Sequence, residues 1–104
     1  MKRRLFWLVL LALSPFTCIA GSMDAGVLFK TTCAMCHGPD GTGQTPMGEK
    51  LGIKSYKSPD IQKQSDADIK NAIINGKGKM PAFGQRLTPD QVDALVKYIR
   101  EVGK

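Results

Sequence analysis

Residues 33–37 read Cys33-Ala34-Met35-Cys36-His37, and this stretch decides what the rest of the chain has to fold around. Two cysteines separated by two residues, with a histidine directly after the second, form the attachment pattern of c-type haem. Each thiol can add to one vinyl group of the porphyrin, and the histidine that follows can offer a ring nitrogen to the iron. The motif therefore predicts one covalently bound haem c, held by Cys33 and Cys36 with His37 as an iron ligand.

Two other uses of paired cysteines fit this sequence less well. A thioredoxin-like redox pair belongs to a βαβ pattern, and no such pattern surrounds Cys33 and Cys36. A zinc site takes four ligands, usually Cys and His, whereas residues 21–104 contain two cysteines and one histidine. Zinc would therefore need a carboxylate or a partner chain. A chance pentapeptide does not explain why these three residues share one motif.

The first twenty residues have the pattern of an export signal. A basic segment, residues 2–4, precedes an uninterrupted apolar run, residues 5–13. That run is shorter than the ~20 residues that a membrane-spanning helix needs. Residues 18–20 place small side chains where signal peptidase cleaves. We expect residues 1–20 to be a cleaved Sec-type signal peptide and residues 21–104 to be one domain in the periplasm.

The lesser alternatives for this leader are a twin-arginine signal, a lipoprotein cysteine at Cys18 and a retained anchor.

Removal of residues 1–20 would change the net charge and the number of cysteines. The whole chain has 15 Lys+Arg, 9 Asp+Glu and a formal charge of +6. Residues 1–20 hold three of the basic residues and no acidic one, which leaves a charge of +3. This excess is too small for a nucleic-acid-binding face, and a length of 104 residues excludes a multidomain enzyme.

Apolar residues at helical spacing predict an all-α fold with three main helices. The expected helices run from Ser22 or Asp24 to Thr32, from a Ser65 cap to Gly76, and from a Thr88 cap through Pro89 to the C-terminus. Their predicted buried stripes are Ala25, Leu28, Phe29 and Thr32; Ile69, Ala72 and Ile73; and Val92, Leu95, Val96, Ile99 and Val102. Residues 38–64 lack periodicity apart from one helical turn at 58–60. Such a long loop makes sense if it wraps around a large bound group.

Over residues 24–104 the chain resembles the class I c-type cytochromes, small monohaem proteins of bacterial periplasms. The resemblance rests on Phe29 before the motif, on Gly38 after it, on residues 76–83 (Gly-Lys-Gly-Lys-Met-Pro-Ala-Phe), and on Leu95 and Tyr98. It implies a cytochrome c fold with long loops wrapped around one covalent haem. It also implies that the first and last helices cross at Phe29, Leu95 and Tyr98, with Ala25 in the small position of the crossing.

The resemblance also implies the second iron ligand. Residues 21–104 contain four methionines: Met23, Met35, Met47 and Met80. Met35 lies inside the motif, and Met23 lies on the first helix near the proximal side. Met80, between a glycine and a proline, matches the Met-Pro ligand turn of the family, which makes His37 and Met80 the axial pair. Met47 is the remaining alternative.

Other contacts of the haem follow from the family in the same way. A proline carbonyl, here that of Pro46, is expected to accept a hydrogen bond from the free ring N–H of His37. Tyr56 and Gln44 are candidates for the haem propionates. Five lysines lie near the expected haem edge: Lys50, Lys54, Lys57, Lys77 and Lys79. They are either ordinary solvated surface or a loose basic ring that steers the protein onto an acidic partner.

His/Met ligation fills both axial positions, which suits a one-electron carrier rather than a catalyst. We therefore expect a monomeric periplasmic carrier, not an enzyme, with no small-molecule substrate and no nucleic-acid partner. Its donors and acceptors would be redox proteins, such as membrane oxidase or reductase complexes or periplasmic enzymes. The alternatives are a haem enzyme or gas sensor with a displaceable distal ligand, and a cytochrome subunit of an oxidase or dehydrogenase complex.

Overall fold

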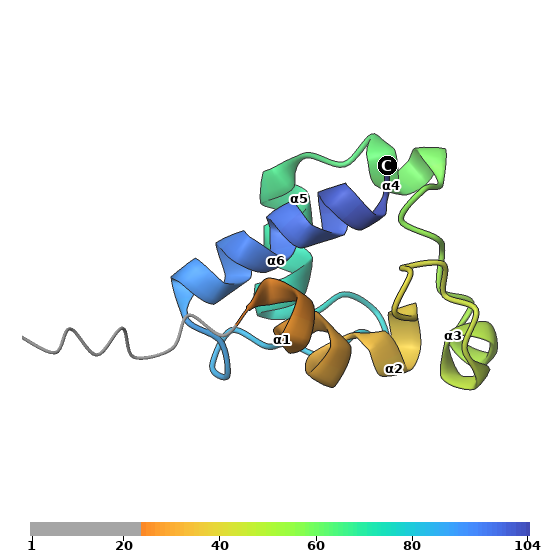
Figure 1. Ribbon diagram of the computed structural model, residues 1–104, viewed down its shortest axis with the longest axis horizontal. Helices are drawn as coiled ribbons and strands as arrows, with labels where there is room; N and C mark the ends of the chain where they lie inside the picture. Colours follow the sequence, from red (N-terminus) through yellow and green to blue (C-terminus); the bar gives the residue numbers. More distant parts are fainter. Residues whose placement is uncertain (1–23) are drawn as a thin grey trace, which may run out of the picture.

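Six helices follow one another along residues 24–104, the part of the chain that the computed structural model describes, and no strand lies between them there (Figure 1). The helices are α1 (Ala25–Thr32), α2 (Ala34–His37), α3 (Pro46–Leu51), α4 (Pro59–Gln62), α5 (Asp66–Asn75) and α6 (Pro89–Val102). This confirms the all-α prediction, with α1, α5 and α6 as the three main helices. The predicted signal peptide, residues 1–20, lies outside the described residues.

Each main helix begins at the side-chain cap that the sequence predicts. A carboxylate oxygen of Asp24 accepts a hydrogen bond of 2.7 Å from the N–H of Gly26 at the start of α1. Ser65 and Thr88 each form a complete capping box, in which the residue three positions later bonds back to the cap. Such caps satisfy backbone N–H groups that a helix start leaves unpaired, at a gain of about 1 kcal/mol each.

The three short helices account for the difference from the predicted pattern. The sequence predicts a turn where α4 lies, but it does not predict α3. Six residues are too few to show a helical period, so only the local chemistry marks α3. The Thr45 hydroxyl accepts a 2.8 Å hydrogen bond from Gly48 N–H, and Pro46 takes the first helical position. The same hydroxyl lies 2.8 Å from the Cys36 carbonyl oxygen and donates to it, which ties α3 to α2.

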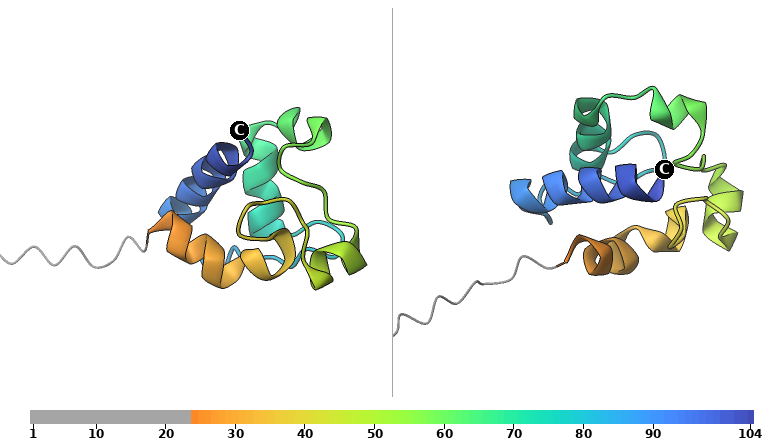
Figure 2. Two further views of the ribbon diagram at one scale, coloured as in Figure 1. Left: turned by 45° about the vertical axis from the view of Figure 1, so that its right-hand side comes forward. Right: turned by 45° about the horizontal axis from the view of Figure 1, so that its top comes forward.

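The core forms where α6 packs against both α1 and α5 (Figure 2). It consists of nine buried side chains: Leu28, Phe29, Tyr56, Ile69, Ile73, Val92, Leu95, Val96 and Ile99. The predicted stripes supply eight of these, and the loop before α4 supplies Tyr56. Phe29 and Leu95 are fully buried, and the rings of Phe29 and Tyr98 lie 5.0 Å apart. The predicted crossing of the first and last helices is therefore present.

Gly26 also lies at this crossing. A β-carbon placed on Gly26 would lie 3.4 Å from Cε2 of Tyr98, which is an ordinary van der Waals contact, and 3.0 Å from the Asp24 carboxylate. Ala25 remains the predicted small residue of the crossing. Among residues 24–104, no helix has both the length and the apolar composition needed to cross a membrane.

Candidate functional site

The cysteine–histidine motif lies on one helical turn. Cys33 ends α1 and begins α2, and the N–H of His37 donates to the Cys33 carbonyl over 3.0 Å. Positions i, i+3 and i+4 share one face of a helix, so Cys33, Cys36 and His37 face the same side. Both cysteines are half-buried and neither forms a disulfide. Met35 lies off this face and is 77% exposed, which confirms that it is not placed to serve the site.

A cavity of about 420 Å³ has both predicted iron ligands on its walls. His37 enters the wall from α2, and Met80 enters it from the turn that follows α5. Apolar side chains make up much of the remaining wall: Ile53, Tyr56, Ile61, Ile69, Ile73 and Ile99. A cavity of this size with a few polar groups is typical of a cofactor site.

The turn that carries Met80 is closed by two reciprocal backbone hydrogen bonds. The N–H of Met80 donates to the Lys77 carbonyl over 3.0 Å, and the N–H of Lys77 donates to the Met80 carbonyl over 3.1 Å. Gly76 has a φ of +74°, and a β-carbon there would lie 2.6 Å from the Met80 carbonyl oxygen. Met80 is half-buried against the core, whereas Met47 is 41% exposed and does not line the cavity.

His37 presents a neutral imidazole to this cavity. Its ring stacks on that of Tyr56, and its backbone carbonyl accepts a 2.7 Å hydrogen bond from Gly43 N–H. Burial lowers the pKa of His37, which favours the uncharged ring that binds a metal. Nδ1 is buried without a hydrogen-bond partner. The structure does not contain the predicted hydrogen bond to the carbonyl of Pro46, the first residue of α3.

Cys33 has the properties of a structural thiol rather than of a reactive one. Burial, followed by the charge of Cys36, raises the pKa of the Cys33 thiol to about 11. Reactive dithiols have lowered pKa values instead. In residues 24–104, no group of three or more His, Cys, Asp or Glu side chains is placed to hold a metal ion. The thioredoxin-like and zinc interpretations therefore have no support in the described part of the chain.

The two residues predicted as partners of the haem propionates lie in different environments. Tyr56 is buried and lines the cavity, whereas Gln44 is exposed and does not. The structure adds polar residues to the cavity wall that the sequence did not single out for the haem: Asp60 and Gln64. Lys54 and Lys77, seen in the sequence only as surface charge, also line it. Their positions depend on the path of the loop, which no local pattern encodes.

Cys33, Cys36 and His37 share one helical face, and His37 and Met80 line one cavity. Two thiols, an imidazole and a thioether are the donor set that haem c requires. The fold and this site define the class of c-type cytochromes. The family model described as "Cytochrome C oxidase, cbb3-type, subunit III" matches residues 22–99. The chain belongs to this cytochrome c family.

Several known cytochromes are similar to the chain. Cytochrome c6 of Gloeothece citriformis is 36% identical over 83 residues, which cover 75% of this chain and 71% of that protein. Cytochrome c6 of a Nostoc species is 31% identical over 109 residues, which cover 93% of this chain and 91% of that protein. The cbb3-type cytochrome c oxidase subunit FixP of Azorhizobium caulinodans is 38% identical over 73% of this chain but only 25% of FixP.

The solved structure of the KustC0563 c-type cytochrome superposes with a TM-score of 0.72 at 37% identity, covering 79% of this chain and 100% of that one. The predicted family and fold are thereby confirmed. The protein is a small class I c-type cytochrome, its cofactor is covalently bound haem c, and its function is electron transfer.

Proposed function

We propose that this cytochrome is a one-electron carrier in which Cys33 and Cys36 hold the haem by thioethers, and His37 and Met80 are the axial ligands. The observation that carries the proposal is that His37 and Met80 line the same cavity from different elements of the fold. When bound, haem c supplies an iron that takes up and releases one electron. A thioether ligand is a soft donor that favours ferrous iron, so Met80 would raise the reduction potential.

The protein residues around the cavity support a carrier rather than an enzyme. His37 and Met80 together would leave the iron no open position for oxygen or a substrate. Ile69, Ile73 and Ile99 keep water away from the cavity and give it a low dielectric. The closed Met80 turn and the hydrogen-bonded α2 hold both ligands on backbone that has little freedom to move. A site that changes little between two redox states transfers electrons quickly and catalyses little else.

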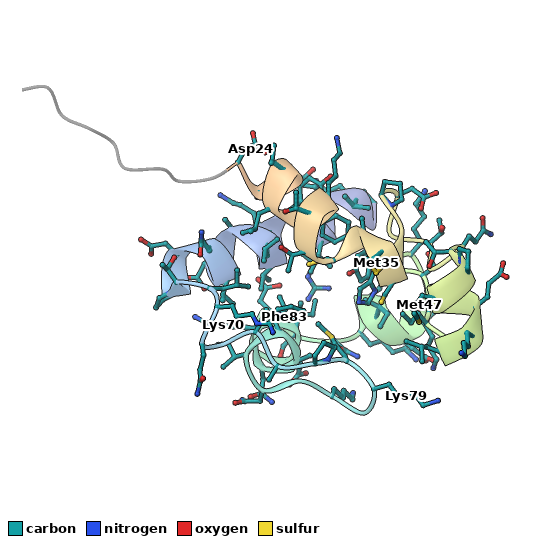
Figure 3. All side chains as sticks on the ribbon, turned by 90° about the horizontal axis from the view of Figure 1, so that it is seen from below. Asp24, Met35, Met47, Lys70, Lys79 and Phe83 are labelled. Carbon is teal, nitrogen blue, oxygen red and sulfur yellow. The ribbon has the colours of Figure 1, made fainter. Side chains whose placement is uncertain are left out.

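The partners that we propose are redox proteins with an acidic docking face. Two exposed methionines, Met35 and Met47, lie on the neighbouring helices α2 and α3 (Figure 3). The five lysines predicted near the haem edge are all exposed: Lys50, Lys54, Lys57, Lys77 and Lys79. Exposed positive charge of this kind favours fast and weak docking over tight binding. A membrane oxidase or reductase complex or a periplasmic enzyme would fit, with this protein acting as a monomer.

We also propose that residues 1–20 are cleaved as a signal peptide and that the domain works in the periplasm. The support is the basic segment, the apolar run and the small residues before position 21. A cytochrome subunit of an oxidase complex is the second candidate function. The similarity to FixP favours it, although that match covers only 25% of FixP.

The spectrum of the purified holoprotein tests the carrier proposal against a haem enzyme or gas sensor. We expect low-spin ferric haem with the weak near-infrared band of a sulfur–iron bond, and a ferrous form that does not take up carbon monoxide readily. High-spin ferric haem whose reduced form binds carbon monoxide at once would contradict the proposal. It would show an open distal position, as an enzyme or sensor requires.

A further inference from the structure

The wall of the haem cavity has a charged and polar side. Lys54, Asp60 and Gln64 all line the cavity, and all three come from the stretch between α3 and α5. In Figure 1 this stretch runs from α3, which lies beside α2, to α4 at the top of the domain. These three residues form the polar part of the cavity wall.

Lys54 and Asp60 form an ion pair at the rim. The Lys54 Nζ lies 2.5 Å from Asp60 Oδ2, and the two side chains are 60% and 62% exposed. Exposed pairs contribute little stability, about 0–1 kcal/mol. The pair can therefore rearrange at small cost when another anion comes within reach of the Lys54 ammonium group.

Gln64 is held beside this pair by α6. Its backbone carbonyl accepts a hydrogen bond from the Arg100 guanidinium group. The same guanidinium also pairs with Asp66 at 2.9 Å. The segment that follows α4 is thus fixed to the last helix, and Gln64, a residue with an amide side chain, lines the cavity.

Haem itself carries two anions on one edge. Its propionates lie on the edge of the porphyrin opposite the two positions that form thioethers. Attachment at Cys33 and Cys36 would direct the propionates away from α2, and Lys54 and Gln64 offer a cation and an amide to them in the cavity wall. Lys77 also lines the cavity, but its backbone closes the Met80 turn, so it belongs to the distal side of the site.

We propose that Lys54 and Gln64 bind a haem propionate, with Asp60 as a competing partner of the Lys54 ammonium group. This inference rests on the proposed haem site and extends it to the charged edge of the cofactor. A propionate anion stabilises ferric iron, and the positive charge of Lys54 offsets that effect. Lys54 therefore sets the reduction potential, and Asp60 acts against it by competing for the same ammonium group.

Reduction potentials of the holoprotein and its Lys54→Gln variant test the inference, with Lys57→Gln as the matched control. Lys57 lies on the same segment and is exposed but does not line the cavity. We expect Lys54→Gln to lower the potential by an amount equal to a roughly two- to fivefold change in the oxidised-to-reduced ratio, the range of an exposed ion pair. Lys57→Gln should change it much less. Asp60→Asn should shift the potential upwards.

A second readout separates a direct contact from a distant charge. The propionate bending band in the resonance Raman spectrum should move in Lys54→Gln and stay unchanged in Lys57→Gln. Equal effects of the two variants in both measurements, or a shifted band in Lys77→Gln with none in Lys54→Gln, would overturn the inference. Failure of the haem site itself would look different. It would appear in the unmutated protein as absence of covalent haem or of the low-spin spectrum.

Discussion

The imidazole of His37 stacks on the phenol ring of Tyr56, with the ring centroids 5.0 Å apart and the planes inclined by 24°. Tyr56 is fixed through its backbone on both sides. Its N–H donates to the Gly41 carbonyl over 2.9 Å, and its carbonyl accepts a 2.7 Å hydrogen bond from Gln62 Nε2. The same Gln62 amide donates to the Gly103 carbonyl over 3.1 Å. The orientation of the His37 ring thus depends on the loop, α4 and the C-terminus together.

Gln62→Glu should weaken this arrangement without changing the size of the side chain. A carboxylate cannot donate to the carbonyls of Tyr56 and Gly103, so two hydrogen bonds are lost. The carboxylate oxygens of the variant would also repel these two carbonyl oxygens. We expect a loss of about 1–3 kcal/mol in the free energy of unfolding of the holoprotein, measured by urea titration. Gln85→Glu, at an exposed site, is the control. Equal unfolding midpoints for both variants would show that the Gln62 contacts contribute nothing.

Gly48→Ala should disturb the haem-attachment motif from a distance in the sequence. A β-carbon at Gly48 would lie 2.2 Å from the Gly43 carbonyl oxygen and 2.5 Å from that of Cys36. Both contacts are with backbone, so α3 would have to move away from α2. We expect a lower yield of holoprotein and a lower unfolding temperature.

Gly52→Ala is the comparison for this variant. A β-carbon at Gly52 has open space around it, and only its φ of +67° makes alanine unfavourable. That strain is worth roughly 1–2 kcal/mol. A Gly48→Ala protein that is at least as stable as Gly52→Ala would mean that the close approach of α3 to α2 is not required.

Removing the cysteines should reveal how far folding depends on the cofactor. Cys33→Ala or Cys36→Ala should each leave one thioether, and the double variant should leave a largely unfolded chain, because the core surrounds the cavity and binding is linked to folding. Mass spectrometry reports the attached haem, and circular dichroism reports the helices. A double variant that is as helical without haem as the holoprotein would contradict this linkage.

The pKa of Asp40 tests whether the loop forms the hydrogen bonds between Thr42 and Asp40 in solution. The Thr42 hydroxyl donates to the Asp40 carboxylate over 2.8 Å, and hydrogen bonds from Thr42 hold the pKa of Asp40 below its usual value. Because the pKa of Asp40 is lowered in the folded protein, the ionised carboxylate stabilises the fold. This stabilisation is present above the usual carboxyl pKa and is lost as the pH falls through the lowered pKa of Asp40. Thr42→Val should raise the pKa of Asp40 in an NMR titration and leave that of Asp60 unchanged. An unshifted Asp40 would show that the bond does not form in solution.

Local chemistry is what made the main helices predictable from the sequence. The caps at Ser65 and Thr88 and the apolar stripes each involve residues within a few positions of one another. The structure confirms both caps and buries eight of the twelve stripe residues, whereas Ala25, Thr32, Ala72 and Val102 are half-buried. α3 was not predicted because six residues carry no period.

The site was predictable to the extent that its residues lie in motifs. The sequence singled out His37 and Met80, and the structure brings them to one cavity. The predicted hydrogen bond from His37 to the Pro46 carbonyl is not present in the structure. Asp60 and Gln64 were not foreseen, because only the path of the long loop brings them to the cavity.

The central claim is that Met80, and no other methionine, closes the distal side of the iron opposite His37. The measurement that tests it most directly is the near-infrared sulfur–iron band of the ferric holoprotein in Met80→Ala and Met47→Ala. Met80→Ala should keep its haem through Cys33, Cys36 and His37, lose the band, fall in reduction potential and bind carbon monoxide. Met47→Ala should keep the band. A protein that loses the band with Met47→Ala and keeps it with Met80→Ala would contradict the account.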